Sequence, residues 1–171
     1  MAYRRILLAY DGSMQGRSAL REGALLARRC RAKVYLLSVV AETPGLRIAE
    51  GQHPGAVSQH LDSLRTVLDT GVENLRRLGF DPEARLVVGE PSIEIGAYAR
   101  QIKADLVVVG HRRQSLMERW WLGATGGYLV DHIDCSLLIS RLSISDQAFE
   151  AELKRIEADE AAVMGDEIGL A

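Results

Sequence analysis

Two glycines, Gly110 and Gly123, enclose a loop that is both basic and aromatic. Gly110 ends an apolar run at 105–110, and Gly123 stands just before a second glycine cluster. Glycine has no Cβ atom, so its backbone can turn sharply and bring N–H groups close to a phosphate. The loop is therefore a candidate phosphate-binding segment.

Asp11 is the other residue whose position suits ligand chemistry. It follows the apolar run at 3–10 and precedes Gly12. An aspartate before a glycine is also a routine turn-former, so a structural and a functional interpretation both stay open.

Catalytic patterns are not visible in the sequence. We find no paired carboxylates, no Ser/His arrangement and no second acid near Asp11 that would suggest a general base. Neither glycine cluster precedes a Gly-Lys-Ser/Thr sequence, so a P-loop is absent. The four histidines lack metal-ligand spacing, so we expect no metal beyond a Mg²⁺ that a nucleotide would bring. The sequence thus favours a binding protein, not an enzyme, and a slow nucleotide hydrolase is the weakest hypothesis.

Strand and helix patterns alternate along the chain. We predict strands at 3–10, 32–40, 83–89, 105–110 and 136–140. Helical patterns run from the N-cap Ser13 to about Cys30, from Val57 to Gly79, and from Pro91 through Ile93, Ala97 and Ile102, with a short helix expected at 126–133. This order predicts an α/β fold, a doubly wound sandwich around a five-stranded parallel sheet.

Ligands of such sheets bind beyond the carboxyl ends of the strands, where the strand order reverses. In this fold the first and fourth strands flank that point. We therefore expect the turn at Asp11 and the turn at Gly110 to meet in space, and this position favours a ligand role for Asp11.

Three segments carry a resemblance to a known family: "RRILLAYDGS" (4–13), "AKVYLLSVV" (32–40) and the stretch from 107 to 140. Together they resemble the universal stress protein family over residues 1–141. The resemblance implies the strand order 3-2-1-4-5 and a regulatory role in the stress response. It also implies a homodimer joined along the fifth strand. Some members of this family bind ATP and others do not.

The ATP-binding members carry Gly, two residues, Gly, nine residues, then Gly followed by Ser or Thr. Gly110 and Gly123 match this pattern, whereas Arg113 replaces the second glycine and Ala124 replaces the hydroxyl residue. Losing the hydroxyl donor costs roughly 0.5–1.5 kcal/mol of binding free energy. The next residue, Thr125, carries a hydroxyl, but its side chain would point in a different direction from the helix start. We therefore expect binding of ATP or AMP to be weakened.

Arg113 itself has two interpretations. Its side chain would crowd a triphosphate; alternatively Arg112, Arg113 and Arg119 would supply charge to a phosphate, or they are solvated loop arginines. In family members with ATP, the acid equivalent to Asp11 and the backbone around Val40 lie beside the nucleotide. The expected nucleotide-binding set is Ala9, Tyr10, Asp11, Val40, Val109, Gly110, Arg112, Arg113, Gly123, Ala124 and Thr125.

Charge and composition exclude several classes. The formal net charge is −2, too small for a broad grip on nucleic acid or a membrane surface, and no apolar run approaches the length of a membrane span. Neither Cys30 nor Cys135 sits in a Cys-x-x-Cys pair, and we see no signal peptide, so we expect a cytosolic chain with reduced thiols.

Residues 142–171 form an acidic extension beyond the 1–141 domain. From 143 onward they contain eight acidic and two basic residues, a net charge of −6. Phe149, Leu153, Ile156 and Val163 form one helical stripe, and such a helix must pack on the body or on a partner, because alone it is not stable.

The fifth strand, with Leu137, Leu138 and Ile139, lies at the sheet edge in the family order. An uncovered apolar edge invites pairing, so we expect a homodimer through this strand, with the extension beside the seam or reaching onto the partner. The alternative to nucleotide binding is a nucleotide-independent dimeric module whose surface contacts another protein.

Overall fold

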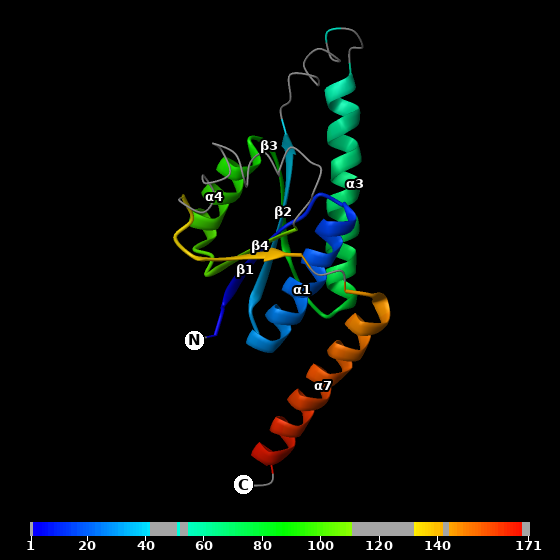
Figure 1. Ribbon diagram of the computed structural model, residues 1–171, viewed down its shortest axis with the longest axis vertical. Helices are drawn as coiled ribbons and strands as arrows, with labels where there is room; N and C mark the ends of the chain where they lie inside the picture. The colour runs from blue at the N-terminus through cyan, green and yellow to red at the C-terminus, as the bar shows by residue number, and fades with distance from the viewer. Residues whose placement is uncertain (1, 42–50, 52–54, 111–131, 142–143, 169–171) are drawn as a thin grey trace.

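A computed structural model describes residues 2–41, 51, 55–110, 132–141 and 144–168. Five parallel strands form one sheet in the order β3-β2-β1-β4-β5, which confirms the predicted fold (Figure 1). The strands are β1 (Arg5–Ala9), β2 (Lys33–Ala41), β3 (Glu83–Gly89), β4 (Leu106–Gly110) and β5 (Ser136–Ser140).

Helices cover both faces of this sheet. Helices α1 (Met14–Cys30) and α3 (Ala56–Arg77) pack on one face, and α4 (Pro91–Ile102) packs on the other. Ser13 caps α1 as expected, since its side chain accepts a hydrogen bond from the Gly16 N–H at 3.0 Å. The predicted short helix at 126–133 lies almost entirely outside the described residues.

The core consists of two apolar layers, one on each side of the central strands. Ile6, Leu8 and Val108 face α1 and α3, while Leu7 and Val107 face α4. Successive side chains of a strand point to opposite faces, so strands buried on both sides must be apolar throughout. This requirement explains the continuous aliphatic runs in the sequence.

One detail of α4 differs from the prediction. Ile93 was expected on the helical stripe but is 45% exposed, and the buried side of α4 instead carries Ile95, Tyr98 and Ala99. These residues are spaced i, i+3 and i+4, which places them on one face of a helix. That face is the more apolar one, so it packs on the sheet.

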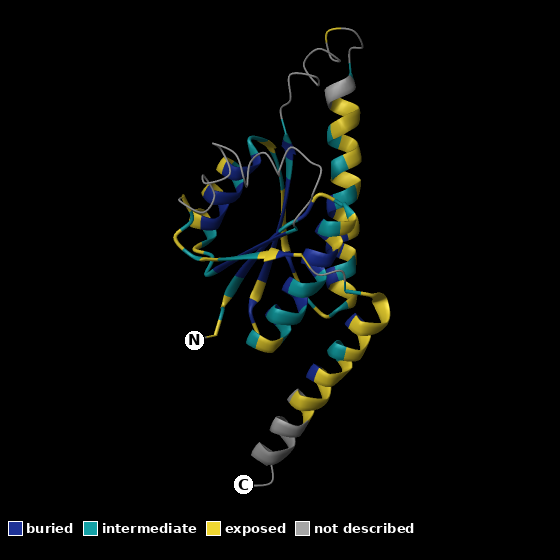
Figure 2. Ribbon diagram, viewed as in Figure 1, coloured by how far each residue is buried: buried dark blue, intermediate teal, exposed yellow. Residues whose placement is uncertain are grey.

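Helix α7 (Asp146–Ile168) follows β5 and packs against α1 (Figures 1 and 2). Phe149 and Ile156 are buried, and Arg29 of α1 forms an ion pair with Glu152. The first half of the extension is therefore attached to its own domain. None of the described helices is both long and apolar enough to cross a membrane.

Candidate functional site

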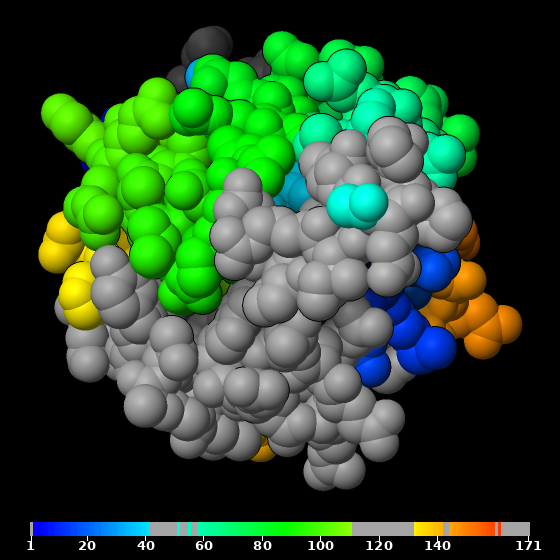
Figure 3. Space-filling view, turned by 90° about the horizontal axis from the view of Figure 1, so that it is seen from above, coloured from blue at the N-terminus to red at the C-terminus, as the bar shows by residue number. Residues whose placement is uncertain are grey.

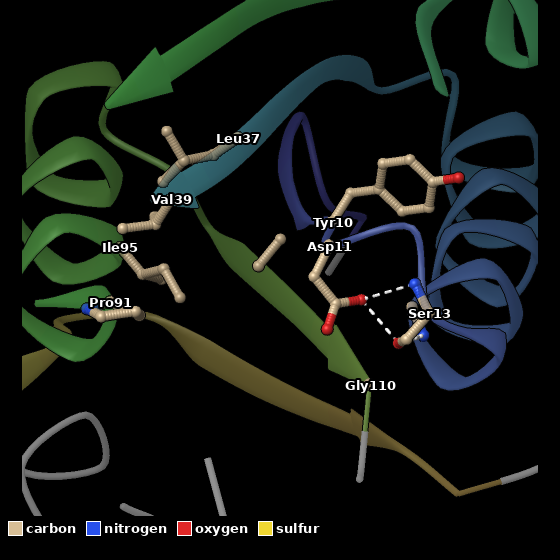
Figure 4. A pocket seen from close by; sticks show the side chains of 10 residues that line it. Tyr10, Asp11, Ser13, Leu37, Val39, Pro91, Ile95 and Gly110 are labelled. Carbon is tan, nitrogen blue, oxygen red and sulfur yellow. Dashed lines mark hydrogen bonds between the residues drawn. The ribbon is translucent and has the colours of Figure 1, made fainter. Parts of the chain in front are cut away.

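A cleft opens at the carboxyl ends of β1, β2 and β4, where the strand order reverses (Figure 4). Figure 3 views this end of the molecule, with β3 and α4 in green on one side and the first turns of α1 in blue on the other. The cleft is lined by Ala9, Tyr10, Asp11, Ser13, Gly16, Leu37, Val39, Pro91, Ile95 and Gly110. The turns at Asp11 and Gly110 thus line the same cleft.

Asp11 lies at the N-terminus of α1. Its Oδ1 accepts hydrogen bonds from the Ser13 N–H at 3.0 Å and from the Ser13 hydroxyl at 2.5 Å. A Cβ atom on Gly16 would collide with this same oxygen, so the glycine makes room for the carboxylate. The carboxylate is held where the positive end of the helix dipole favours an anion.

Tyr10 follows β1 at the rim of the cleft and is hydrogen-bonded to β2. Its N–H donates to the Leu37 carbonyl at 2.8 Å, and its carbonyl accepts from the buried Ser38 hydroxyl at 2.7 Å. The Tyr10 ring points away from Pro91 and Ile95 (Figure 4). Burial raises the pKa of the phenol, Arg17 partly offsets this rise, and Asp11 adds to it.

Gly110 allows β4 to approach α1 closely. A Cβ atom at this position would lie 2.7 Å from the backbone carbon and oxygen of Gln15. The glycine is therefore required by packing at the mouth of the cleft, whether or not a phosphate binds there.

The opposite wall is apolar. Leu37 and Val39 of β2 lie together with Pro91 and Ile95 of α4 on the side of the cleft opposite Asp11 and Ser13 (Figure 4). The side chains of Val40 and Val109 are fully buried and neither lines the cleft, so the nucleotide contact expected from the backbone around Val40 stays a prediction. Side chains alternate along a strand, so Val39 points into the cleft and Val40 points away from it.

Several lining residues were missed in the sequence, namely Ser13, Gly16, Leu37, Val39, Pro91 and Ile95. One available signal was that the carboxyl ends of parallel strands share an edge. The helix start at Pro91, directly after β3, therefore had to border the same cleft. The expected loop residues Arg112, Arg113, Gly123, Ala124 and Thr125 lie outside the described residues.

The arrangement combines one apolar wall with a carboxylate acceptor beside a helix N-terminus on the opposite side. Such an arrangement offers apolar contact area to a ligand, and ligand hydroxyl or N–H groups would donate to Asp11. Among the described residues, no group of three or more His, Cys, Asp or Glu side chains is placed to hold a metal ion.

The fold and this cleft define an α/β protein with a cleft at the switch point of a parallel sheet, where ligands of such sheets bind. The chain belongs to the universal stress protein family, because the model of the "Universal stress protein family" matches residues 2–141.

A curated relative supports the same membership. The universal stress protein Sll1388 from Synechocystis is 26% identical over 151 residues, which cover 81% of this chain and 98% of the relative.

Solved structures share the fold. A universal stress protein in complex with cAMP has a TM-score of 0.60 and 22% identity, covering 82% of this chain and 98% of that one. The universal stress protein from Archaeoglobus fulgidus in complex with dAMP has a TM-score of 0.58 and 20% identity, covering 81% and 98%. Both of these similar proteins hold an adenine nucleotide.

Proposed function

We propose that this protein is a stress-response regulator whose cleft binds an adenine nucleotide without dedicated catalysis. The observation that carries the proposal is the cleft itself, with Asp11 fixed at the N-terminus of α1 opposite the apolar wall of Val39, Pro91 and Ile95. In this proposal the adenine lies against the apolar wall, and ribose hydroxyls donate to Asp11. Relatives with cAMP and dAMP support this choice of ligand class.

Calorimetric titration with ATP, AMP and cAMP tests the proposal. We expect saturable binding of at least one nucleotide, weakened roughly tenfold to a hundredfold by Asp11→Ala, because hydrogen bonds to a charged group contribute about 1.5–3 kcal/mol. Asp69→Ala on the exposed surface of α3 is the matched control and should leave affinity unchanged. Absence of binding in the wild type would favour the nucleotide-independent interaction module.

We further propose that triphosphate binding is weakened by Arg113 and Ala124. An arginine in place of glycine crowds the phosphates, and alanine lacks the hydroxyl donor. The double variant Arg113→Gly with Ala124→Ser should bind ATP more tightly than the wild type does. No gain in ATP affinity, or wild-type protein that purifies fully occupied by ATP, would contradict this part.

The assembly proposed for the regulator is a homodimer through β5. Leu137 and Leu138 are half-buried and Ile139 is 37% exposed, so the strand presents an apolar edge. Antiparallel pairing with a second copy about a two-fold axis would cover both edges at once.

A further inference from the structure

A second cavity, of about 540 Å³, lies between α1, the C-terminal end of α3 and α7. Its volume falls within the range of roughly 300–1,000 Å³ that is typical of small-molecule sites. It shares only Tyr10 with the nucleotide cleft, and α7 lies outside residues 2–141. We refer to it as the α7 groove. Its lining residues other than Tyr10 are Arg17, Leu20, Arg21, Asn74, Arg77, Leu78, Asp146, Phe149, Glu150, Leu153, Lys154 and Glu157.

One side of the α7 groove is anchored by Arg21. Its guanidinium donates to the Ile144 carbonyl at 2.9 Å, forms an ion pair with Asp146, and lies 5.8 Å from the centre of the Phe149 ring. These contacts hold the start of α7 against α1. The groove is therefore walled by a fixed helix.

The floor of the α7 groove is apolar and recessed. Leu20 is 5% exposed and Phe149 is 8% exposed, and Leu153 lines the same space. These side chains lie at the bottom of the groove and leave apolar surface for a ligand that enters it. The floor suits a compact apolar ligand body.

The polar wall presents a guanidinium beside a buried phenol. Tyr10 is only 5% exposed and lines the groove, and Arg17 lies close enough to act electrostatically on the Tyr10 hydroxyl. Arg21 and Arg77 have carboxylate partners in Asp146 and Glu73. Arg17 is exposed and takes part in none of the ion pairs found among the described residues, and it lines the groove together with Glu150 and Glu157 of α7.

We propose that the α7 groove binds a small amphipathic anion, a carboxylate carried on an apolar body. The carboxylate pairs with Arg17, whose planar fork of donors matches its geometry, and accepts a hydrogen bond from the Tyr10 hydroxyl. The apolar body lies on Leu20, Phe149 and Leu153. The α1 and α3 walls carry only basic charges, whereas the α7 wall carries Lys154 with the acids Asp146, Glu150 and Glu157, so the carboxylate is expected on the α1 side of the groove.

Titration of the full-length protein with decanoate, followed by calorimetry, tests this site. We expect saturable binding with one decanoate per chain, and a dissociation constant raised about tenfold by Arg17→Gln through loss of the charged hydrogen bonds. Arg76→Gln is the matched control, because Arg76 is exposed on α3 and does not line the groove. Decanol, which has the same chain without the charge, should bind much more weakly.

Three results would overturn the proposal. The first is the absence of saturable decanoate binding. This holds also if hydrogen exchange shows that a second copy of the chain covers the groove and thereby blocks it. The second is equal affinity in the wild type and Arg17→Gln. The third is decanol binding as tightly as decanoate. Arg17 is exposed, so we expect Arg17→Gln to unfold at the same temperature as the wild type. An unchanged unfolding temperature would show that a loss of decanoate binding does not come from misfolding.

Discussion

At Gly110 the backbone of β4 comes so close to the first turn of α1 that no side chain fits between them. The same type of constraint acts at Gly16, whose missing side chain leaves room for the Asp11 carboxylate. Both glycines thus bring backbone N–H groups and an acid to one edge of the cleft.

Gly110→Ala should destabilise the protein by about 1–3 kcal/mol, because the added methyl group meets immobile backbone atoms of Gln15 at 2.7 Å. Gly96→Ala on α4 is the matched control. There the nearest atoms lie at 3.6 Å, and replacing a helical glycine gains up to roughly 1 kcal/mol. Urea unfolding measures the stability of both variants. Equal free energies of unfolding for Gly110→Ala and the wild type would show that the backbone around Gln15 shifts to make room for the methyl group.

Residue-level prediction from the sequence was strongest where a residue ends a strand. Ala9, Tyr10, Asp11 and Gly110 were expected at the cleft and line it. Ile95 was not expected, since its position depends on how α4 crosses the sheet, and the periodicity of the helix does not fix that crossing.

At the level of elements, α7 shows how an extension attaches to a completed fold. Its sequence predicted an amphipathic helix but left open whether the body or a partner receives the apolar stripe. The structure places Phe149 and Ile156 against the chain's own domain. Exposed ion pairs such as Arg29–Glu152 contribute little, so the apolar contacts decide the attachment.

Ile156→Ala should therefore loosen α7. Ile156 is 3% exposed, and truncating a buried isoleucine costs about 2–5 kcal/mol at most sites. The helix cannot persist alone, so we expect faster amide hydrogen exchange throughout α7. Ile93→Ala, at a 45% exposed position of α4, should change exchange and stability little. Unchanged exchange in α7 after Ile156→Ala would contradict this attachment.

The docking surface of α7 could not be predicted from the sequence. It is built from side chains such as Arg21 and Arg29, which lie more than a hundred residues earlier in the chain. By contrast, the strand order followed from the alternating pattern together with the family resemblance. The arrangement of distant segments could thus be predicted from the sequence where rules of sheet topology apply, but the position of a docked helix could not.

At the level of the whole molecule, the two edges of the sheet differ. The β3 edge carries charged contacts, with Glu83 paired to Lys33 and Arg85 bonded to Gln101. The β5 edge carries Leu137, Leu138 and Ile139 instead. Charged side chains protect an edge from pairing, so β5 is the edge that we expect to assemble.

Ile139→Lys should convert the homodimer to a monomer, as measured by light scattering at micromolar concentration. Ile139 is 37% exposed, so the charge affects the edge more than the core. Leu138→Lys should also disrupt the dimer, but Leu138 packs on the core and the fold would suffer too. Val88→Lys, at a 44% exposed position of β3, is the matched control and should remain dimeric. A wild-type monomer, or a dimer unaffected by Ile139→Lys, would refute this assembly.

The central claim, that the cleft between β1, β2, β4 and α4 holds an adenine nucleotide, is tested most directly by amide chemical shifts during titration with AMP. We expect saturable shifts at Ala9–Ser13, Gly16, Leu37, Val39, Ile95 and Gly110, which line the cleft. The amides of α7 from Phe149 to Glu157 should change little, because they line the other groove. Shifts confined to that groove, or no saturable shift anywhere in the described chain at millimolar AMP, would contradict the account.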